Sequence, residues 1–68
     1  MLKIELTDRE KVLMPLMELG LSNVEIGKRL DLSPNTIRAH IANIFKKLKA
    51  GGMKVPNRIK AVNWYRGE

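Results

Sequence analysis

The most restrictive feature of the chain is a set of helix-start signals separated by very few residues. Thr7-Asp8-Arg9-Glu10 and Ser22-Asn23-Val24-Glu25 each fit a capping box, in which a hydroxyl and a carboxylate satisfy backbone amides. Ser33-Pro34 marks a further start, because proline at the first helical position needs no amide partner. Asn57 can cap a last helix. The expected helices cover about residues 7–19, 22–30, 34–49 and 57–66.

These signals predict an all-α fold. The 68 residues are enough for one small core, so residues 1–68 are expected to form a single domain. No segment is a convincing strand. Only residues 31–33 separate the second helix from the third, which is the spacing of a helix-turn-helix. The sequence therefore predicts a four-helix bundle that contains a helix-turn-helix.

Some positions carry more local expectations. Pro15 is expected to bend the first helix or to break it, because it lacks an amide donor. Gly27 costs the second helix about 1 kcal/mol relative to alanine, and either a close helix crossing or simple tolerance explains it. Residues 50–56 include two adjacent glycines and are expected to be the most flexible stretch. The expected inward residues of the first two helices are Val12, Leu13, Leu16, Leu19, either Val24 or Ile26, and Leu30.

Size and composition exclude several classes of function. A chain of 68 residues has no room for a catalytic domain with a cofactor pocket, so no enzymatic activity, cofactor or small-molecule ligand is expected. The chain has no cysteine and one histidine, which leaves no metal site. No apolar run can span a bilayer, and the N-terminus lacks the apolar core of a signal peptide. We therefore expect a soluble, cytoplasmic protein without a membrane partner.

The positive charge lies almost entirely in the second half of the chain. Residues 1–33 carry five basic and six acidic side chains, whereas residues 34–68 carry eight basic side chains and one acidic one. The net charge of +6 thus arises from −1 in the first part and +7 in the second. Such asymmetry indicates a surface for a polyanion, most often a nucleic acid.

The predicted third helix has a narrow apolar stripe and an unusual opposite face. At about 100° per residue, Ile37, Ile41, Ile44 and Leu48 align and must face the core. The opposite face is small and amide-rich, with no acidic side chain. Arg38 can donate in a fork to guanine, Asn43 can pair with adenine, and the two alanines allow a close approach to base edges. The candidate base-reading residues are Arg38, Ala39, Ala42 and Asn43.

Phosphate groups are the second expected target of this part of the chain. Helix N-termini and cationic side chains bind phosphate and fix the register of a protein on a duplex. The candidate phosphate contacts are Ser22, Asn23, Ser33, Asn35, Thr36, His40, Lys46 and Lys47. Together with the base-reading face, they predict a partner in double-stranded DNA.

These segments resemble a known family. The chain is similar to the DNA-binding domain of the LuxR/GerE family (NarL-like output domains), in the same order over about residues 6–66. The motifs that carry the resemblance are LTDRE at 6–10, GLSNVEI at 20–26, LDLSPNTIRAHI at 30–41 and NIFKKL at 43–48.

The resemblance implies a transcriptional regulator whose third helix enters the major groove. It implies that Arg38 and Ala39 read bases and that Thr36, His40 and Lys47 lie near the DNA backbone. It also implies a homodimer through the last helix on an inverted repeat, with Lys60, Asn63 and Trp64 as the candidate dimer or partner surface. Compared with the family pattern, residues 50–54 are extra, and they either lengthen the third helix or re-site the fourth.

A second interpretation is a helix-turn-helix module that binds RNA polymerase, a sigma factor or another protein rather than a specific operator. The two interpretations differ in salt dependence, because DNA binding releases counterions and weakens steeply as salt rises.

Overall fold

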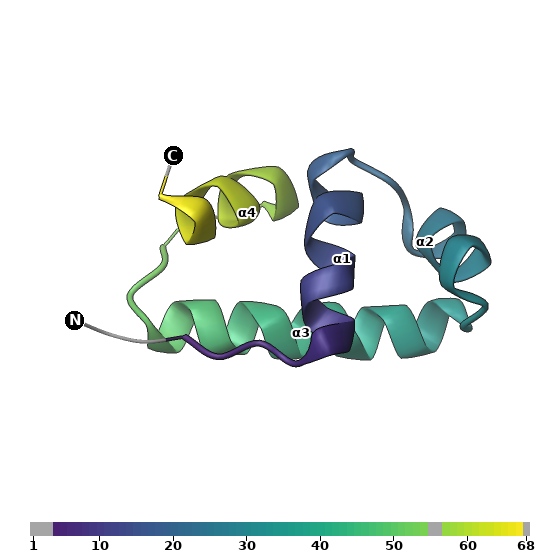
Figure 1. The fold of residues 1–68 in the computed structure, drawn as a ribbon, viewed down its shortest axis with the longest axis horizontal. Coiled ribbons are helices and arrows are strands. Elements are labelled where there is room, and N and C mark those ends of the chain that lie inside the picture. The colour runs from purple at the N-terminus through teal and green to yellow at the C-terminus, as the bar shows by residue number, and fades with distance from the viewer. Residues whose placement is uncertain (1–3, 55–56, 68) are drawn as a thin grey trace.

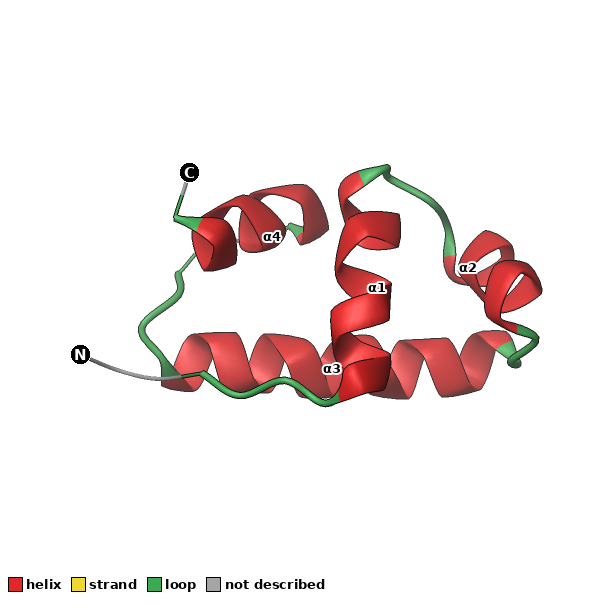
Figure 2. Ribbon diagram, in the orientation of Figure 1, coloured by secondary structure: helices red, strands yellow, loops and turns green. Residues whose placement is uncertain are grey.

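The computed structural model describes residues 4–54 and 57–67, and in these it contains four helices and no strand. Figure 1 and Figure 2 show α1 (Asp8–Glu18), α2 (Asn23–Leu30), α3 (Pro34–Ala50) and α4 (Arg58–Arg66). The prediction of an all-α fold with a helix-turn-helix is confirmed. The expected ranges were longer by one residue at both ends of α1 and at the starts of α2 and α4, and shorter by one at the end of α3; the other ends agree.

The long helix α3 defines the shape of the molecule, which measures 35 × 19 × 16 Å. In Figure 1, α1 crosses α3 near its middle, α2 lies near the start of α3, and α4 lies above its other half. The closest packing is between α1 and α4 and between α2 and α3. Because α2 and α4 both lie on the upper side of α3 in this view, no described helix covers its lower side.

The helix starts form as the sequence predicts. Thr7 and Ser22 each accept a hydrogen bond from the backbone N–H of the glutamate three residues on, and each glutamate accepts one from the cap's own N–H. Ser33 accepts from the Thr36 amide, and Asn57 accepts from the Lys60 amide. All four caps satisfy amides that a helix leaves unpaired at its first turn.

The core lies where the four helices meet. Its buried apolar residues are Leu6, Leu13, Met14, Met17, Ile26, Ile37, Ile41, Ile44, Leu48, Met53, Ala61 and Val62. The apolar stripe predicted for α3 is therefore buried throughout its length.

The predicted inward face of α1 and α2 was partly wrong. Leu13 is buried, but Val12 and Leu19 are 47% and 67% exposed. The inward face of α1 consists of Glu10, Leu13, Met14 and Met17, a helical stripe turned away from both exposed residues. In α2, Ile26 is fully buried and Val24 is exposed.

Pro15 does not break α1, which continues without interruption from Asp8 to Glu18. Its missing N–H deprives the Lys11 carbonyl of its usual partner. Pro15 and Lys11 are both exposed, so water can hydrate that carbonyl at little cost.

The turn of the helix-turn-helix explains Gly27. A Cβ at this position would lie 2.4 Å from the carbonyl oxygen of Leu32, so the close approach is made by the turn that follows α2. Asp31 takes the left-handed conformation, with φ of 56°, and the Leu32 amide donates to the Gly27 carbonyl. Close packing, rather than simple tolerance, therefore accounts for the glycine.

The extra residues after α3 are anchored to the core. The amide of Met53 donates to the Leu48 carbonyl, and the amide of Gly52, with φ of 106°, donates to the Lys49 carbonyl. This is the Schellman arrangement of a helix end. Met53 is 3% exposed, so one residue of the stretch expected to be flexible is buried in the core. Val55 and Pro56 lie outside the described residues.

Candidate nucleic-acid interface

The outer face of α3 is continuous and exposed. All four candidate base-reading residues lie on it, together with Lys46 and Lys49, and each of these side chains is exposed. The helix contains no acidic residue, whereas it carries four cations. An α-helix about 10–12 Å across with its side chains fits the DNA major groove, which is about 12 Å wide.

The start of α3 holds a small network of polar side chains. The hydroxyls of Ser33 and Thr36 lie 2.9 Å apart, within hydrogen-bonding distance. The Arg38 guanidinium donates to Oδ1 of Asn35 at 2.9 Å, one turn earlier on the helix. The structure thus brings these candidate residues together at the N-terminus of α3, with Arg38 oriented by Asn35.

A side chain from the start of α4 reaches the start of α2. Asn23 accepts a hydrogen bond from the guanidinium of Arg58 at 2.6 Å, and the same guanidinium donates to the Leu21 carbonyl at 3.3 Å. The Ser22 hydroxyl is used for capping. The structure therefore connects Asn23, one of the candidate phosphate contacts, to the first residue of α4, a connection that the sequence did not predict.

Toward its C-terminus, the outer face of α3 borders a hollow beside the start of α1. The hollow has a volume of about 580 Å³ and is lined by Thr7, Glu10, His40, Asn43, Lys46, Lys47 and Ala50. It brings together three of the candidate phosphate contacts and one candidate base-reading residue.

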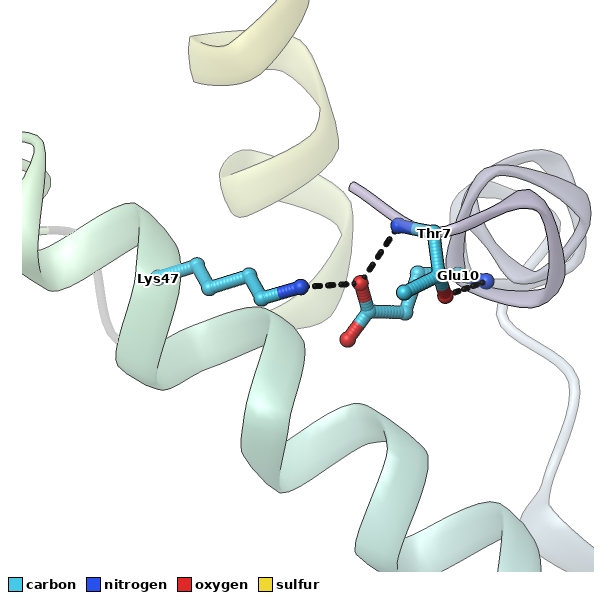
Figure 3. Close-up of polar contacts among 3 residues, drawn as sticks. All are labelled: Thr7, Glu10 and Lys47. Atoms are coloured by element: carbon cyan, nitrogen blue, oxygen red, sulfur yellow. Dashed lines mark hydrogen bonds and ion pairs between the residues drawn. The ribbon is translucent and has the colours of Figure 1, made fainter. Parts of the chain in front are cut away.

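One of these cations is paired within the protein. Lys47 Nζ lies 2.6 Å from Oε1 of Glu10, which also accepts from the Thr7 amide at 2.8 Å, as Figure 3 shows. Glu10 is 3% exposed. Its burial alone raises the carboxyl pKa, but the hydrogen bonds from Lys47 and Thr7 outweigh it, and the pKa of Glu10 is lowered overall.

Sequence reasoning assigned Glu10 to the capping box but missed this second role. The capping motif indicates that the carboxylate turns back toward the backbone of α1. It carries no information about a lysine 37 positions later, because that contact depends on how α1 crosses α3.

The candidate partner surface lies on α4, away from the outer face of α3. Lys60 is exposed, whereas Asn63 and Trp64 are partly buried. Trp64 packs against the core, and Ile59 is 45% exposed. An apolar hollow of about 580 Å³ between the end of α1 and the start of α4 is lined in part by Met17, Leu21 and Ile59.

No helix among residues 4–54 and 57–67 is long and apolar enough to cross a membrane.

The chain matches known proteins over nearly its whole length. The family model for bacterial regulatory proteins of the luxR family matches residues 5–65. The probable csgAB operon transcriptional regulatory protein of Salmonella typhimurium is 42% identical over 59 residues, 87% of this chain and 25% of that protein. The nitrate/nitrite response regulator protein NarL of Escherichia coli is 34% identical over 64 residues, 94% of this chain and 27% of that protein.

A third relative is the transcriptional regulatory protein FixJ of Rhizobium meliloti, which is 40% identical over 45 residues, 66% of this chain and 22% of that protein. The chain thus spans about a quarter of the length of these relatives. No solved structure matches it.

Proposed function

Because the chain belongs to the LuxR family of bacterial regulatory proteins, we propose that it binds double-stranded DNA at specific sequences and thereby regulates transcription. The observation that carries the proposal is the outer face of α3, which is exposed, free of acidic side chains and built from small, amide and cationic residues. Its relatives are transcriptional regulators by name, so an enzymatic activity is not part of the proposal. We place its action in the bacterial cytoplasm, where the DNA lies.

Base reading is proposed for the middle of this face. Arg38 gives up its hydrogen bond to Asn35 and donates two hydrogen bonds to O6 and N7 of a guanine. Asn43 pairs with an adenine. Ala39 and Ala42 add little bulk, so the helix axis can approach the base edges closely, with methyl groups available to thymine. Each two-pronged contact is worth about 1–3 kcal/mol of discrimination.

Phosphate contacts are proposed around this face. They fix the position of α3 in the groove and supply most of the affinity, without reading sequence. The proposed set is Ser22, Asn23, Ser33, Asn35, Thr36, His40 and Lys46. Lys47 is not included, because its ammonium is paired with Glu10.

A homodimer through α4 is proposed, with Lys60, Asn63 and Trp64 at the interface. Ile59 supports this proposal, since its exposed side chain adds apolar surface to the same helix. A two-fold dimer places two copies of α3 on half-sites one helical turn apart, on the same face of the duplex.

Selection of bound sequences from a random duplex library tests the function. We expect an enriched inverted repeat, and an affinity for it that falls steeply with salt. A library without enrichment, together with a shallow salt dependence and direct binding to RNA polymerase, would instead support the protein-binding interpretation.

A further inference from the structure

Two adjacent lysines of α3 have different surroundings, although the sequence gives them the same expected role. Among the described residues, Lys46 is exposed and makes no hydrogen bond or ion pair. Lys47 is bound to Glu10 through the 2.6 Å contact, and its side chain is 37% exposed. The charge of Lys46 is available to a polyanion, whereas the charge of Lys47 is already compensated.

Release of Lys47 has a cost that release of Lys46 does not have. The Glu10 carboxylate is 3% exposed, and within the described residues its hydrogen bonds come from Lys47 and the Thr7 amide. If Lys47 turned toward a phosphate, the Glu10 carboxylate would lose its cation and one of these two hydrogen bonds, a cost that does not arise for Lys46.

The contact also connects two elements that are far apart in the sequence. Glu10 lies in the first turn of α1, and Lys47 lies in the last turn of α3. The other titratable side chains that line the same hollow are His40 and Lys46, both on α3. Among the residues that line the hollow, Glu10 therefore supplies the carboxylate, and Lys47 is the cation that pairs with Glu10.

We propose that Lys47 is a positioning residue that holds the C-terminal half of α3 against the start of α1, and that Lys46, not Lys47, neutralises phosphate there. The inference rests on the proposed function, because it concerns how α3 is presented to DNA. It changes the role that the sequence assigned to Lys47, and it gives Glu10 a role beyond helix capping.

The test compares Lys46→Gln with Lys47→Gln, which remove the same charge from neighbouring positions. The affinity of the full chain for a labelled duplex of random sequence is measured at several salt concentrations. Each phosphate neutralised contributes about 0.9 to the slope of log affinity against log salt. We expect Lys46→Gln to reduce the magnitude of the slope by about 0.9. When salt is raised from about 50 to 200 mM, the factor by which the affinity falls should then be about 3.5 times smaller for Lys46→Gln than for the wild type.

Lys47→Gln is expected to keep the wild-type slope. A second measurement tests the pair itself, by following the Glu10 carboxyl with NMR during a pH titration. The pKa of Glu10 should rise in Lys47→Gln and stay near the wild-type value in Lys46→Gln and in Lys47→Arg, which retains a cation. If Lys47→Gln does not fold, the double variant Glu10→Gln/Lys47→Gln buries no unpaired charge, and its slope should equal that of the wild type.

A Lys47→Gln slope reduced as much as that of Lys46→Gln, or an unchanged Glu10 pKa in Lys47→Gln, would overturn the inference alone. A wild-type affinity that does not depend on salt would overturn the proposed function and the inference together.

Discussion

The ion pair between Glu10 and Lys47 leads to a quantitative prediction for stability. In the wild type the Glu10 side chain is 3% exposed, and Lys47→Gln removes its 2.6 Å partner. Breaking a fully buried pair costs about 3–5 kcal/mol, whereas an exposed pair contributes about 0–1 kcal/mol. Since the Lys47 side chain is 37% exposed, water screens the pair in part, and we expect a loss of about 1–2 kcal/mol.

The assay is urea unfolding at neutral pH, followed by circular dichroism. The wild type is compared with Lys47→Gln, Glu10→Gln and the double variant, in which a neutral pair replaces the charged one. The double variant should be more stable than the sum of the single losses predicts, with a coupling of about 1 kcal/mol. Lys46→Gln serves as the matched control and should change stability by less than about 0.5 kcal/mol.

The reasoning would be refuted if Lys47→Gln and Lys46→Gln lost the same stability, or if the losses of the two single variants added without coupling. Either result would mean that solvent compensates the Glu10 charge as well as Lys47 does.

Three further predictions concern the fold. Hydrogen bonds lower the pKa values of Glu10 and Glu25, so the stability that these two carboxylates contribute is present above the ordinary glutamate pKa and is lost as pH falls through the lowered values. Urea midpoints measured over about pH 7 to 2 should therefore drop at the acid end, and the drop should be smaller in Glu10→Gln. Met53→Ala should cost about 2–4 kcal/mol through the cavity it leaves, whereas exposed Lys54→Ala should not, as thermal unfolding can determine. Arg58→Lys should lower the free energy of unfolding in urea by about 1 kcal/mol, because an ammonium cannot form both hydrogen bonds that the guanidinium makes to Leu21 and Asn23. An unchanged urea midpoint would argue against this contact.

Local signals predicted the helix boundaries well. The capping boxes at Thr7 and Ser22 and the Ser33-Pro34 start all depend on interactions within a few residues. The apolar stripe of α3 was equally predictable, because a narrow row of isoleucines leaves one choice of inward face.

Features that depend on how helices cross were not predictable in this way. The rotation of α1 about its axis is set by its packing on α3 and α4, and this buries Met14 and Met17 in place of Val12 and Leu19. The anchoring of Met53 also requires a long-range contact, since two preceding glycines indicate only a turn.

In the candidate site, too, the features set within one helix were predictable and those set by contacts between helices were not. A helical spacing of about 100° per residue predicted that Arg38 and Asn43 lie on the outer face of α3, and both are exposed in the structure. The spacing could not distinguish the role of Lys46 from that of Lys47, because only Lys47 contacts the Glu10 carboxylate, which belongs to another helix.

The central claim, that the outer face of α3 reads base sequence, is tested most directly by one titration. Wild type, Arg38→Ala and Arg66→Ala are titrated with the selected duplex and with variants that replace each of its guanines in turn. Arg66, which pairs with Glu18 on α1, controls for the loss of one positive charge from another helix. We expect Arg38→Ala to lose about 1–3 kcal/mol of discrimination at one guanine while Arg66→Ala keeps it. An Arg38→Ala protein that distinguishes every guanine as well as the wild type does would contradict the account.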